Sequence, residues 1–270
     1  MSEERIVRFD NELKIEAYQF KGIMQKFPNH FHEHYVIGFI ESGKRHLSCR
    51  NNDYVIEPGD LMIFNPRDNH TCEQIDNRTL DYRCLNINED IMKKIMREIT
   101  DTEYLPSFFQ NVIFHSDQVP LLREIHEMIM MERRDFEKEE KLLFLIKVLV
   151  DKFAQPLSEE NVYNSEWIKS ICDFIEKNYY ESITLDTLSE LSNMNKYGMI
   201  RKFTKLKGVT PYQYLQAVRI NKAKELLEQG EEVINTAVKT GFTDQSHFTN
   251  FFKRFIGLTP GQYKDIFKEK

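Results

Sequence analysis

The 270-residue sequence lacks a hydrophobic run long enough to cross a bilayer, and one of its longest apolar stretches, LLFLIKVLV, is interrupted by a lysine. Cysteine is scarce, and no two of the four residues are spaced as in a zinc or redox motif: Cys49, Cys72, Cys84 and Cys172. The first ten residues are charged and lack the apolar core of a signal peptide. These absences predict a cytoplasmic protein that keeps its thiols reduced and does not enter a membrane.

An excess of positive charge is also missing. The formal net charge is −6, which taken alone argues against a nucleic-acid partner. The charge is unevenly distributed, however, because residues 161–270 hold 16 Lys and Arg against 13 Asp and Glu, whereas residues 1–160 hold 21 against 30. An acidic first part and a mildly basic second part indicate two modules with different partners.

The hydrophobic pattern changes along the chain. From about 6 to 90 it consists of short apolar or β-branched runs, such as HYVIGFIESGKRHLSC and YVIEPGDLMIFN, separated by turn residues. From about 89 to 157 it has helical periodicity, with Leu142, Leu145, Ile146, Leu149 and Phe153 on one stripe. A polar segment at 154–165 is the expected linker, and the chain after it is helical. The sequence thus predicts an α+β protein, with a cupin-like β-barrel and a helical hairpin in 1–157 and an all-α domain in 158–270.

The all-α part contains a duplicated motif. KFTKLKGVTPYQY at 202–214 aligns without a gap with FFKRFIGLTPGQY at 251–263 after a shift of 49 residues. Each copy has a glycine suited to a helix C-cap, a Thr-Pro pair suited to the start of a helix, and a glutamine that completes a capping box: Gly208, Thr210, Pro211 and Gln213, then Gly257, Thr259, Pro260 and Gln262. We therefore expect each copy to end one helix and begin another.

Each motif belongs to a pair of short helices. Asn195 and Asp244 are good N-caps and predict helices over 195–207 and 244–256, each preceded by a shorter helix, over 184–192 and 232–241. Two such pairs are either duplicated hairpins without a ligand or helix-turn-helix units, whose second helix can lie in a DNA major groove. The five basic residues within 196–207, with no acidic residue among them, favour the second interpretation.

Order, spacing and both turns resemble the DNA-binding domain of the AraC/XylS family of transcription regulators. The resemblance covers about 100 residues, including MIRKFTKLKGVTPYQYLQAVRINKAKELL and AVKTGFTDQSHFTNFFKRFIGLTPGQYK. It implies two helix-turn-helix units held by a linking helix, here about 211–229, with their recognition helices in successive major grooves. The implied partners are double-stranded promoter or operator DNA and, through it, RNA polymerase.

The second helix of each pair has an inward stripe and an outward face. The expected stripes are Met199, Phe203 and Leu206, then Phe248, Phe252 and Phe255. The resemblance places base contacts at Tyr197, Ile200 and Arg201, where arginine suits guanine and isoleucine suits a thymine methyl. The residues expected to face DNA are Lys196, Tyr197, Ile200, Arg201 and Lys205 on the first helix and Gln245, Ser246, Thr249, Asn250 and Lys253 on the second.

Asn250 departs from the family pattern, which usually has arginine at this position. Asparagine can pair with adenine, so the second half-site is expected to be read more weakly or as A·T. Lys205, Lys253 and Arg254 are expected to contact phosphates, which position the protein without specifying sequence. His247 has no plausible catalytic partners nearby, and we expect a backbone or phosphate contact for it.

Histidines gather in the first module, in NHFHEHYVIG and after a Pro-Gly-Asp turn. On a strand, the spacing of two puts His30, His32 and His34 on one face. This part resembles the sugar-binding, cupin-type barrel attached to many members of the same family. Cupin enzymes add a glutamate ligand four or five residues after His-x-His, but positions 36–39 read VIGF. We therefore expect no metal and no cofactor, and a pocket for an organic effector, such as a sugar or related metabolite, lined by His30, His32, His34 and His70. Plain structural histidines and a metal site are the alternatives.

These patterns together indicate a sequence-specific DNA-binding transcription regulator, an activator or a repressor, controlled by a small-molecule effector and not an enzyme. For the leucine stripe in 139–155, the resemblance implies a homodimer seam, and packing against the barrel is the alternative. Two other functions remain open: a cupin-type metal enzyme that carries a DNA-binding tail, and an effector-independent regulator whose barrel only dimerises.

Overall fold

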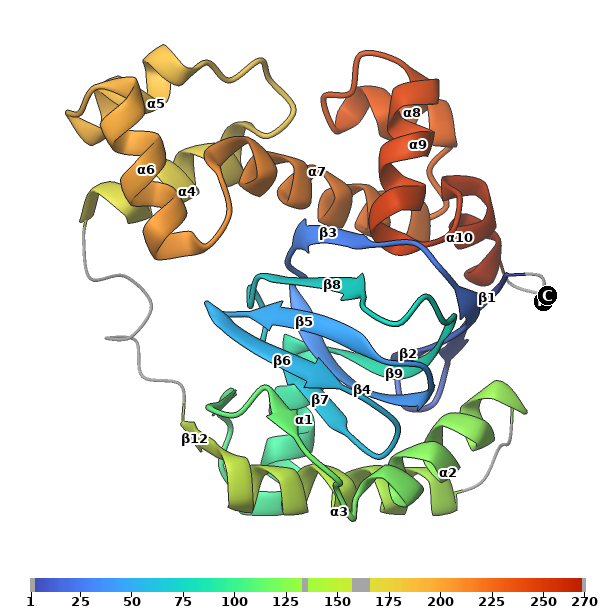
Figure 1. Cartoon of the computed structure of the whole chain (residues 1–270). Coiled ribbons are helices and arrows are strands. Elements are labelled where there is room, and N and C mark those ends of the chain that lie inside the picture. The colour runs from blue at the N-terminus through green and yellow to red at the C-terminus, as the bar shows by residue number, and fades with distance from the viewer. Residues whose placement is uncertain (1–2, 133–135, 157–165, 269–270) are drawn as a thin grey trace. The chain divides into compact units, whose positions relative to one another are not determined.

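The computed structural model describes residues 3–132, 136–156 and 166–268 (Figure 1). Contacts between residues divide the chain into two compact units, one containing 1–26 and 32–157 and the other containing 27–31 and 158–270. We call them the sheet unit and the helical unit. The expected linker is described only at Ala154–Pro156, which forms the short strand β12, and its remainder lies outside the described residues. None of the described helices is both long enough and apolar enough to cross a membrane.

Antiparallel strands make up most of the regular secondary structure of the sheet unit. The larger sheet runs in the order β1-β2-β9-β4-β7-β11, a second sheet contains β8, β5 and β6 in that order, and β10 pairs with β12. Neither sheet pairs its two outer strands within the described part of the chain, so the sheets are open and the closed barrel expected from the sequence is wrong. Alternating patterns locate strands but do not say whether the outermost ones meet. The strands are β1 (Glu4–Asp10), β2 (Ile15–Ile23), β4 (His34–Ser42), β5 (Arg45–Cys49), β6 (Asn52–Ile56), β7 (Leu61–Phe64), β8 (His70–Gln74), β9 (Leu80–Asn88), β10 (Pro106–Phe108) and β11 (Val112–Ile113).

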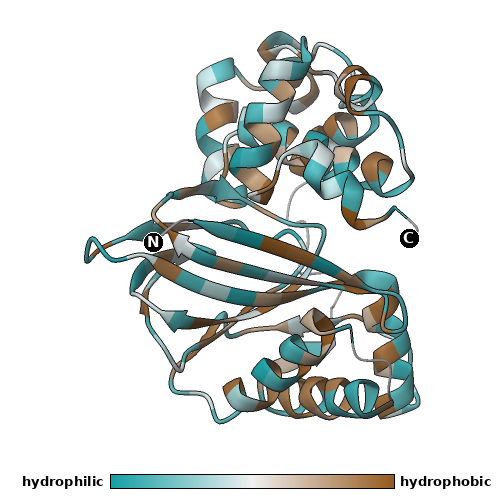
Figure 2. Ribbon diagram, turned by 90° about the vertical axis from the view of Figure 1, so that its right-hand side faces the viewer, coloured by the Kyte–Doolittle hydropathy of each residue, from teal (hydrophilic) through white to brown (hydrophobic). Residues whose placement is uncertain are grey.

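One face of the larger sheet packs against three helices, α1 (Glu89–Thr100), α2 (Val119–Met130) and α3 (Phe136–Phe153). Alternate residues of β4, namely Tyr35, Ile37 and Phe39, point into this layer, and none of them is more than 1% exposed. Figure 2 shows the hydrophobic and hydrophilic stretches that alternate along the strands and helices of this unit. The core of the sheet unit therefore lies between the sheet and the helices.

The leucine stripe of α3 belongs to this core. Leu142, Leu145, Ile146 and Leu149 are at most 2% exposed and pack in the same cluster as the sheet residues. The homodimer seam expected at this stripe is therefore wrong, because these side chains already cover the sheet of their own unit. Periodicity shows that a helix has an apolar face but not which surface that face covers.

The helical unit has helices where the sequence predicts them: α4 (Glu166–Asn178), α5 (Leu185–Ser192), α6 (Lys196–Lys207), α7 (Pro211–Glu228), α8 (Val233–Lys239), α9 (Gln245–Ile256) and α10 (Pro260–Ile266). The observed ends of α5 to α9 agree with the expected ranges to within two residues, which is the precision with which helix ends are defined. Helix α7 runs from the α5–α6 pair to the α8–α9 pair (Figure 1). The all-α prediction and the linking helix are confirmed.

A short strand from the N-terminal half, β3 (Phe27–His30), is grouped with the helical unit by its contacts. Phe31 is 3% exposed in the core of this unit, and its ring centroid lies 5.1 Å from that of Tyr214. Asn29 donates a hydrogen bond from Nδ2 to the Gly208 carbonyl at 2.7 Å. The sequence assigned this segment to the first domain, since five residues do not themselves show which core they join.

Candidate functional site

The two helix pairs α5–α6 and α8–α9 are built with the same local chemistry. The side chains of Asn195 and Asp244 each accept a hydrogen bond from a backbone N–H three residues on, at 2.8 and 2.7 Å, and so begin α6 and α9. Both helices end at a glycine in the left-handed region, Gly208 with φ 68° and Gly257 with φ 88°. Helices α7 and α10, which follow, each begin with a complete capping box. The predicted duplication is therefore confirmed at the level of the caps.

The duplication extends to side-chain packing. Phe203 and Tyr214 meet edge to face with ring centroids 5.7 Å apart, and Phe252 and Tyr263, 49 residues further on, do so at 5.6 Å. Both tyrosines are buried, and each hydroxyl donates to a glutamate carboxylate, at 2.5 and 2.6 Å. The two acceptors, Glu176 and Glu228, lie outside the repeated motif, so the motif does not predict them. The second helix of each pair thus packs in the same way against a tyrosine of the helix that follows it, and a hydrogen bond to a glutamate of another helix holds that tyrosine.

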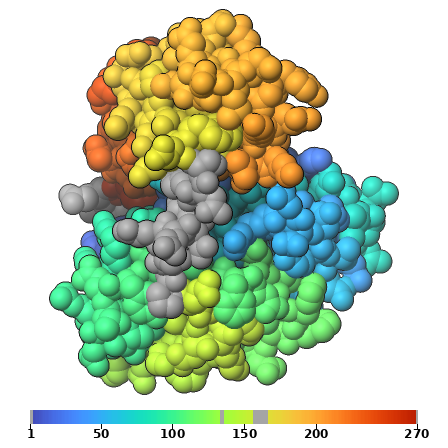
Figure 3. Space-filling view, turned by 90° about the vertical axis from the view of Figure 1, so that its left-hand side faces the viewer, coloured from blue at the N-terminus to red at the C-terminus, as the bar shows by residue number. Residues whose placement is uncertain are grey.

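The outward face of α6 carries the expected basic and aromatic residues. Tyr197 is 76% exposed, and Arg201 and Lys205 are also exposed. Lys196 is exposed too, and its Nζ forms an ion pair with an aspartate of α5 at 2.5 Å. Figure 3 shows this stretch of the helical unit, in orange, at the surface. These exposed cations give α6 a positively charged face, which suits contacts with phosphates and base edges.

Two expectations for α6 need correction. Leu206 was expected to point inward, but it is 56% exposed. Ile200 was expected to face outward, but it is only partly exposed because it packs against the core of the helical unit. Periodicity indicates the side of a helix on which a residue lies, whereas burial also requires another element opposite that residue.

The faces of α9 follow the expected division. Phe248 and Phe252 are fully buried and Phe255 is 8% exposed, which confirms the inward stripe. The outward residues are polar: Gln245, Ser246, Asn250 and Lys253 are exposed, and Thr249 is half-buried. This face carries fewer cations than that of α6, so the two helices present different chemistry in equivalent positions.

His247 is exposed at the start of α9, and its ring packs against aromatic residues. Its centroid lies 5.6 Å from that of Phe242 and 5.7 Å from that of Phe251, both in edge-to-face geometry. These contacts give the imidazole a packing role, and its contact with a phosphate stays a prediction.

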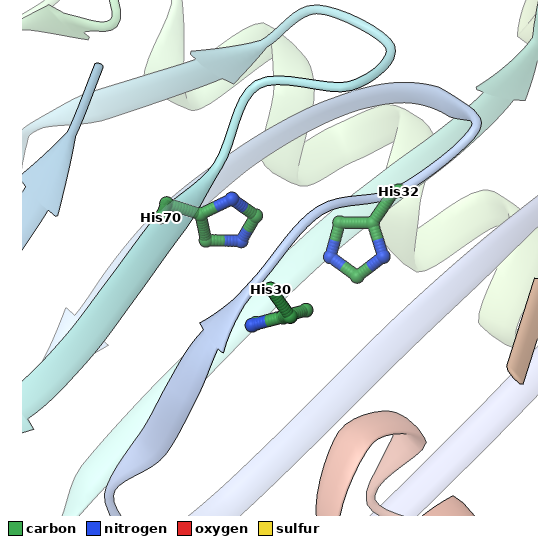
Figure 4. Close-up of side chains that lie close together, drawn as sticks. All are labelled: His30, His32 and His70. Carbon is green, nitrogen blue, oxygen red and sulfur yellow. The ribbon is translucent and has the colours of Figure 1, made fainter. Parts of the chain in front are cut away.

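The structure brings three of the four predicted histidines together. Ring nitrogens of His30, His32 and His70 lie within 4.8 Å of one another (Figure 4). His34 stacks on His32 with ring centroids 5.0 Å apart, outside that group of three. His70 in turn stacks on Phe64 at 4.1 Å. His30 ends β3, His32 lies between the two strands and His34 begins β4, so the three histidines do not share one strand as their spacing led us to expect.

Hydrogen bonds orient two of these rings. His30 Nδ1 lies 2.6 Å from the Pro28 carbonyl oxygen, and His70 Nδ1 lies 3.0 Å from the Asp68 carbonyl oxygen. Because a carbonyl only accepts, Nδ1 of each ring donates its hydrogen, and Nε2 is the acceptor atom of such a ring when the ring is neutral. Burial lowers the pKa of His30 to about 4, an effect that the bond to Pro28 partly offsets, so this ring is neutral at pH 7.

Neutral imidazoles of this kind accept hydrogen bonds from an organic ligand and also suit a transition metal of intermediate softness. Within the described part of the chain, the group of converging ligand atoms includes no carboxylate. The donor set is therefore that of a polar pocket wall or of a three-imidazole site.

The sequence matches known families over both modules. Residues 12–146 match the AraC-like ligand binding domain, and residues 188–266 match a helix-turn-helix domain. The uncharacterized HTH-type transcriptional regulator YbfI of Bacillus subtilis (strain 168) is 51% identical over 247 residues, which cover 91% of this chain and 90% of that protein. The bifunctional transcriptional activator/DNA repair enzyme AdaA of the same strain is 34% identical over 112 residues, covering 41% of this chain and 53% of that protein.

A solved structure has the same fold over nearly the whole chain. Wild-type ToxT from Vibrio cholerae strain SCE256, bound to an unsaturated fatty acid, has a TM-score of 0.55 and 16% identity, covering 93% of this chain and 94% of that one. At this identity the likeness concerns the fold alone.

A ligand-binding module joined to two helix-turn-helix pairs defines a transcriptional regulator that binds DNA and is controlled by a small-molecule effector. Within that class, the chain belongs to the AraC family of HTH-type transcriptional regulators.

Proposed function

We propose that α6 and α9 read base edges in two successive major grooves of one operator. One observation carries this proposal: two helix pairs with equivalent caps and equivalent aromatic packing both leave the polar face of their second helix exposed. The linking helix α7 has 18 residues, so it is about 27 Å long, which is comparable with the roughly 34 Å between successive grooves. The proposed base-reading residues are Tyr197, Arg201, Gln245, Ser246, Thr249 and Asn250. We propose that Lys205, Lys253 and Arg254 contact phosphates and that Lys196 also faces the DNA.

Replacing Arg201 with alanine should weaken operator binding by about 1–3 kcal/mol and relax preference at one or two base pairs in one half-site, because a bidentate contact with guanine is lost. Asn250→Ala should affect only the other half-site, and by less. Lys205→Ala is the matched control: it should weaken all sequences alike and lower the salt dependence by about one unit, because it removes a phosphate contact. Footprinting and affinity measurements on one operator separate these effects.

Two results would contradict the two-groove proposal. If Arg201→Ala and Asn250→Ala disturb the same base pairs, the helices do not read separate half-sites. If neither variant changes sequence preference, the duplicated motif has only a structural role and its helices do not read the base sequence.

We further propose that His30, His32, His34 and His70 line the effector site of the ligand-binding module. Support comes from the three ring nitrogens that converge within 4.8 Å and from the backbone hydrogen bonds that orient two of the rings. ToxT, which has the same fold, was solved with an unsaturated fatty acid bound, and for this reason we do not restrict the proposed effector to sugars. The effector proposed here is an organic molecule with a hydrogen-bond donor that meets the imidazoles.

A thermal-shift screen of small molecules should find a ligand that stabilises the full chain, and at one hundred times its Kd the added stability is about 2.7 kcal/mol. His32→Ala and His70→Ala should abolish this shift while DNA binding without effector is retained. Metal content of the purified protein is the control. If one transition-metal ion per chain is found and is lost in both variants, the site is a metal centre and the organic-effector proposal is wrong.

We also propose a homodimer through the outer side of α3. Phe136 and Phe144 are 81% and 61% exposed on this helix, in contrast to the buried leucine stripe. Sedimentation of the full chain at micromolar concentration should give a dimer, and Phe144→Asp should shift it toward monomer by placing a charge in an apolar contact. A monomeric wild-type chain would exclude the dimer.

A further inference from the structure

Arg219 links the two helix-turn-helix pairs through the middle of α7. Its Nε donates to the Tyr179 carbonyl at 2.7 Å, and its Nη2 donates to the Glu181 carbonyl at 2.9 Å. Both carbonyls lie between α4 and α5, where the chain enters the first pair. The same guanidinium lies over the ring of Phe242, with Cζ 5.9 Å from the ring centroid, in the turn between α8 and α9 of the second pair.

The backbone of the turn between α8 and α9 passes close to the Arg219 guanidinium. Gly241 has φ 77°, and a Cβ at this position would lie 2.8 Å from Nη2 of Arg219 and 2.8 Å from the Tyr180 carbonyl oxygen. A side chain at this position would therefore force this turn away from the segment between α4 and α5. The adjacent Phe242 is 5% exposed, and its ring centroid lies 5.1 Å from that of Phe248 on α9. The turn thus contacts both the arginine and its own recognition helix.

The chemistry of arginine suits a rigid connection. Burial lowers the pKa of Arg219, but a guanidinium remains charged in proteins, so its donors remain available. Both of its hydrogen bonds end on main-chain carbonyls, and its planar group holds them in one fixed geometry. It therefore fixes the course of the backbone and not merely the position of one side chain.

We propose that Arg219 is a positioning residue that sets the separation and orientation of the two reading helices. The regulator is thereby sensitive to the distance between its half-sites. The inference rests on the proposed two-groove reading, since the affinity of a protein that reads only one half-site would not depend on that distance. Arg219 does not need to contact DNA. It acts on the positions of the two helix pairs through the segment between α4 and α5 and the turn between α8 and α9.

The test uses the full chain and an operator selected from random DNA with the wild-type protein. A second duplex carries one inserted base pair between the half-sites, which displaces one of them by about a tenth of a helical turn. The wild type should bind the second duplex about tenfold or more weakly, as it would a mismatched site. Arg219→Met should bind the operator more weakly than the wild type and differ less than about threefold between the two duplexes.

Two variants separate positioning from charge. Lys222→Met removes a cation from the same helix, where Lys222 pairs with Glu225 of α7, and it should keep the wild-type ratio between the duplexes. Arg219→Lys keeps the charge but cannot make both hydrogen bonds in the same geometry, so it should behave like Arg219→Met. A wild-type ratio in Arg219→Lys would overturn the inference, because charge alone would then be sufficient.

The remaining outcomes distinguish this inference from the proposed function. If the wild type itself tolerates the insertion, the two-groove reading fails and the role of Arg219 fails with it. If the wild type discriminates and folded Arg219→Met discriminates equally, only the inference about Arg219 is wrong. Should Arg219→Met fail to give a cooperative melting curve, Gly241→Ala tests the same junction from the other side. It should reduce the ratio in the same way, and a wild-type ratio there would overturn the inference.

Discussion

Replacing Lys138 with alanine should destabilise the sheet unit by about 3–5 kcal/mol, the cost of leaving a buried charge without its partner. Lys138 is 2% exposed, and its Nζ lies 2.5 Å from Oδ2 of Asp10 and 3.0 Å from Oε2 of Glu12. Asp10 is itself 7% exposed, and its Oδ1 accepts hydrogen bonds from the backbone N–H groups of Glu12 and Leu13. The lysine therefore connects α3 to the turn between β1 and β2, and its loss leaves the Asp10 carboxylate buried without its cation.

Amide hydrogen exchange in β1 and β2 of the full chain measures this loss. The single tryptophan, Trp167, lies in the helical unit, so its fluorescence should report unchanged unfolding there. Lys141→Ala is the matched control on the same helix, because it removes a lysine with exposed ion-pair partners and should have little effect. The double variant of Asp10→Asn and Lys138→Met should recover much of the stability, since no buried charge is left. A Lys138→Ala variant as stable as Lys141→Ala would show that the buried pair contributes nothing.

Lowering the pH from 7 to 4 should remove about 3 kcal/mol of sheet-unit stability through His126 alone. His126 lies fully buried on α2, and its Nε2 donates to the Tyr18 carbonyl at 2.9 Å. Burial lowers its pKa from 6.5 to about 4, and the hydrogen bond to Tyr18 offsets only part of that effect. Above pH 6.5 the imidazole is neutral in both states. Between pH 6.5 and 4 only the unfolded chain binds the proton, so the free energy of unfolding falls, and below about pH 4 the loss is complete.

Comparison with His126→Gln isolates this contribution, because the glutamine amide can still donate to the Tyr18 carbonyl but does not titrate. The difference in the free energy of unfolding between wild type and variant should change by about 3 kcal/mol between pH 7 and 4, in favour of the variant at low pH. His247→Gln, which removes an exposed imidazole from the helical unit, serves as the control and should leave the sheet unit unchanged. A pH-independent difference for His126→Gln would mean that this imidazole is protonated inside the folded unit.

Features set within a few residues were predictable. The caps at Asn195, Gly208 and Thr210 depend on side-chain hydrogen bonds and on one left-handed residue, so the motif alone marks where α6 ends and α7 begins. The same chemistry 49 residues later predicted α9 and α10. The histidines do lie near one another, but not through the spacing along one strand, because the chain leaves β3 at His30 and enters β4 at His34.

Features that depend on a partner from a distant element were not predictable. The leucine stripe of α3 would serve a dimer seam or a sheet equally well, and only the packed core shows that it covers the sheet. Leu206 has the spacing of a buried residue but has too little packed over it to be buried. Arg219 was unremarkable in the sequence, since its two acceptors are backbone carbonyls about 40 residues away, and carbonyls are common to all residues.

The sequence by itself determined that this protein has two different modules, that the second repeats one helix-turn-helix unit, and which residues face outward on most of each second helix. It could do so because caps, turns and periodicity act over a few residues, within which the sequence specifies the physical chemistry completely. Only the tertiary structure decided that the sheets stay open, that Lys138 is buried against Asp10, and that Arg219 joins the two helix pairs. These outcomes depend on which surfaces meet after long stretches of chain have folded, and burial then gives an ordinary lysine or arginine an energetic importance that its neighbours in sequence do not reveal.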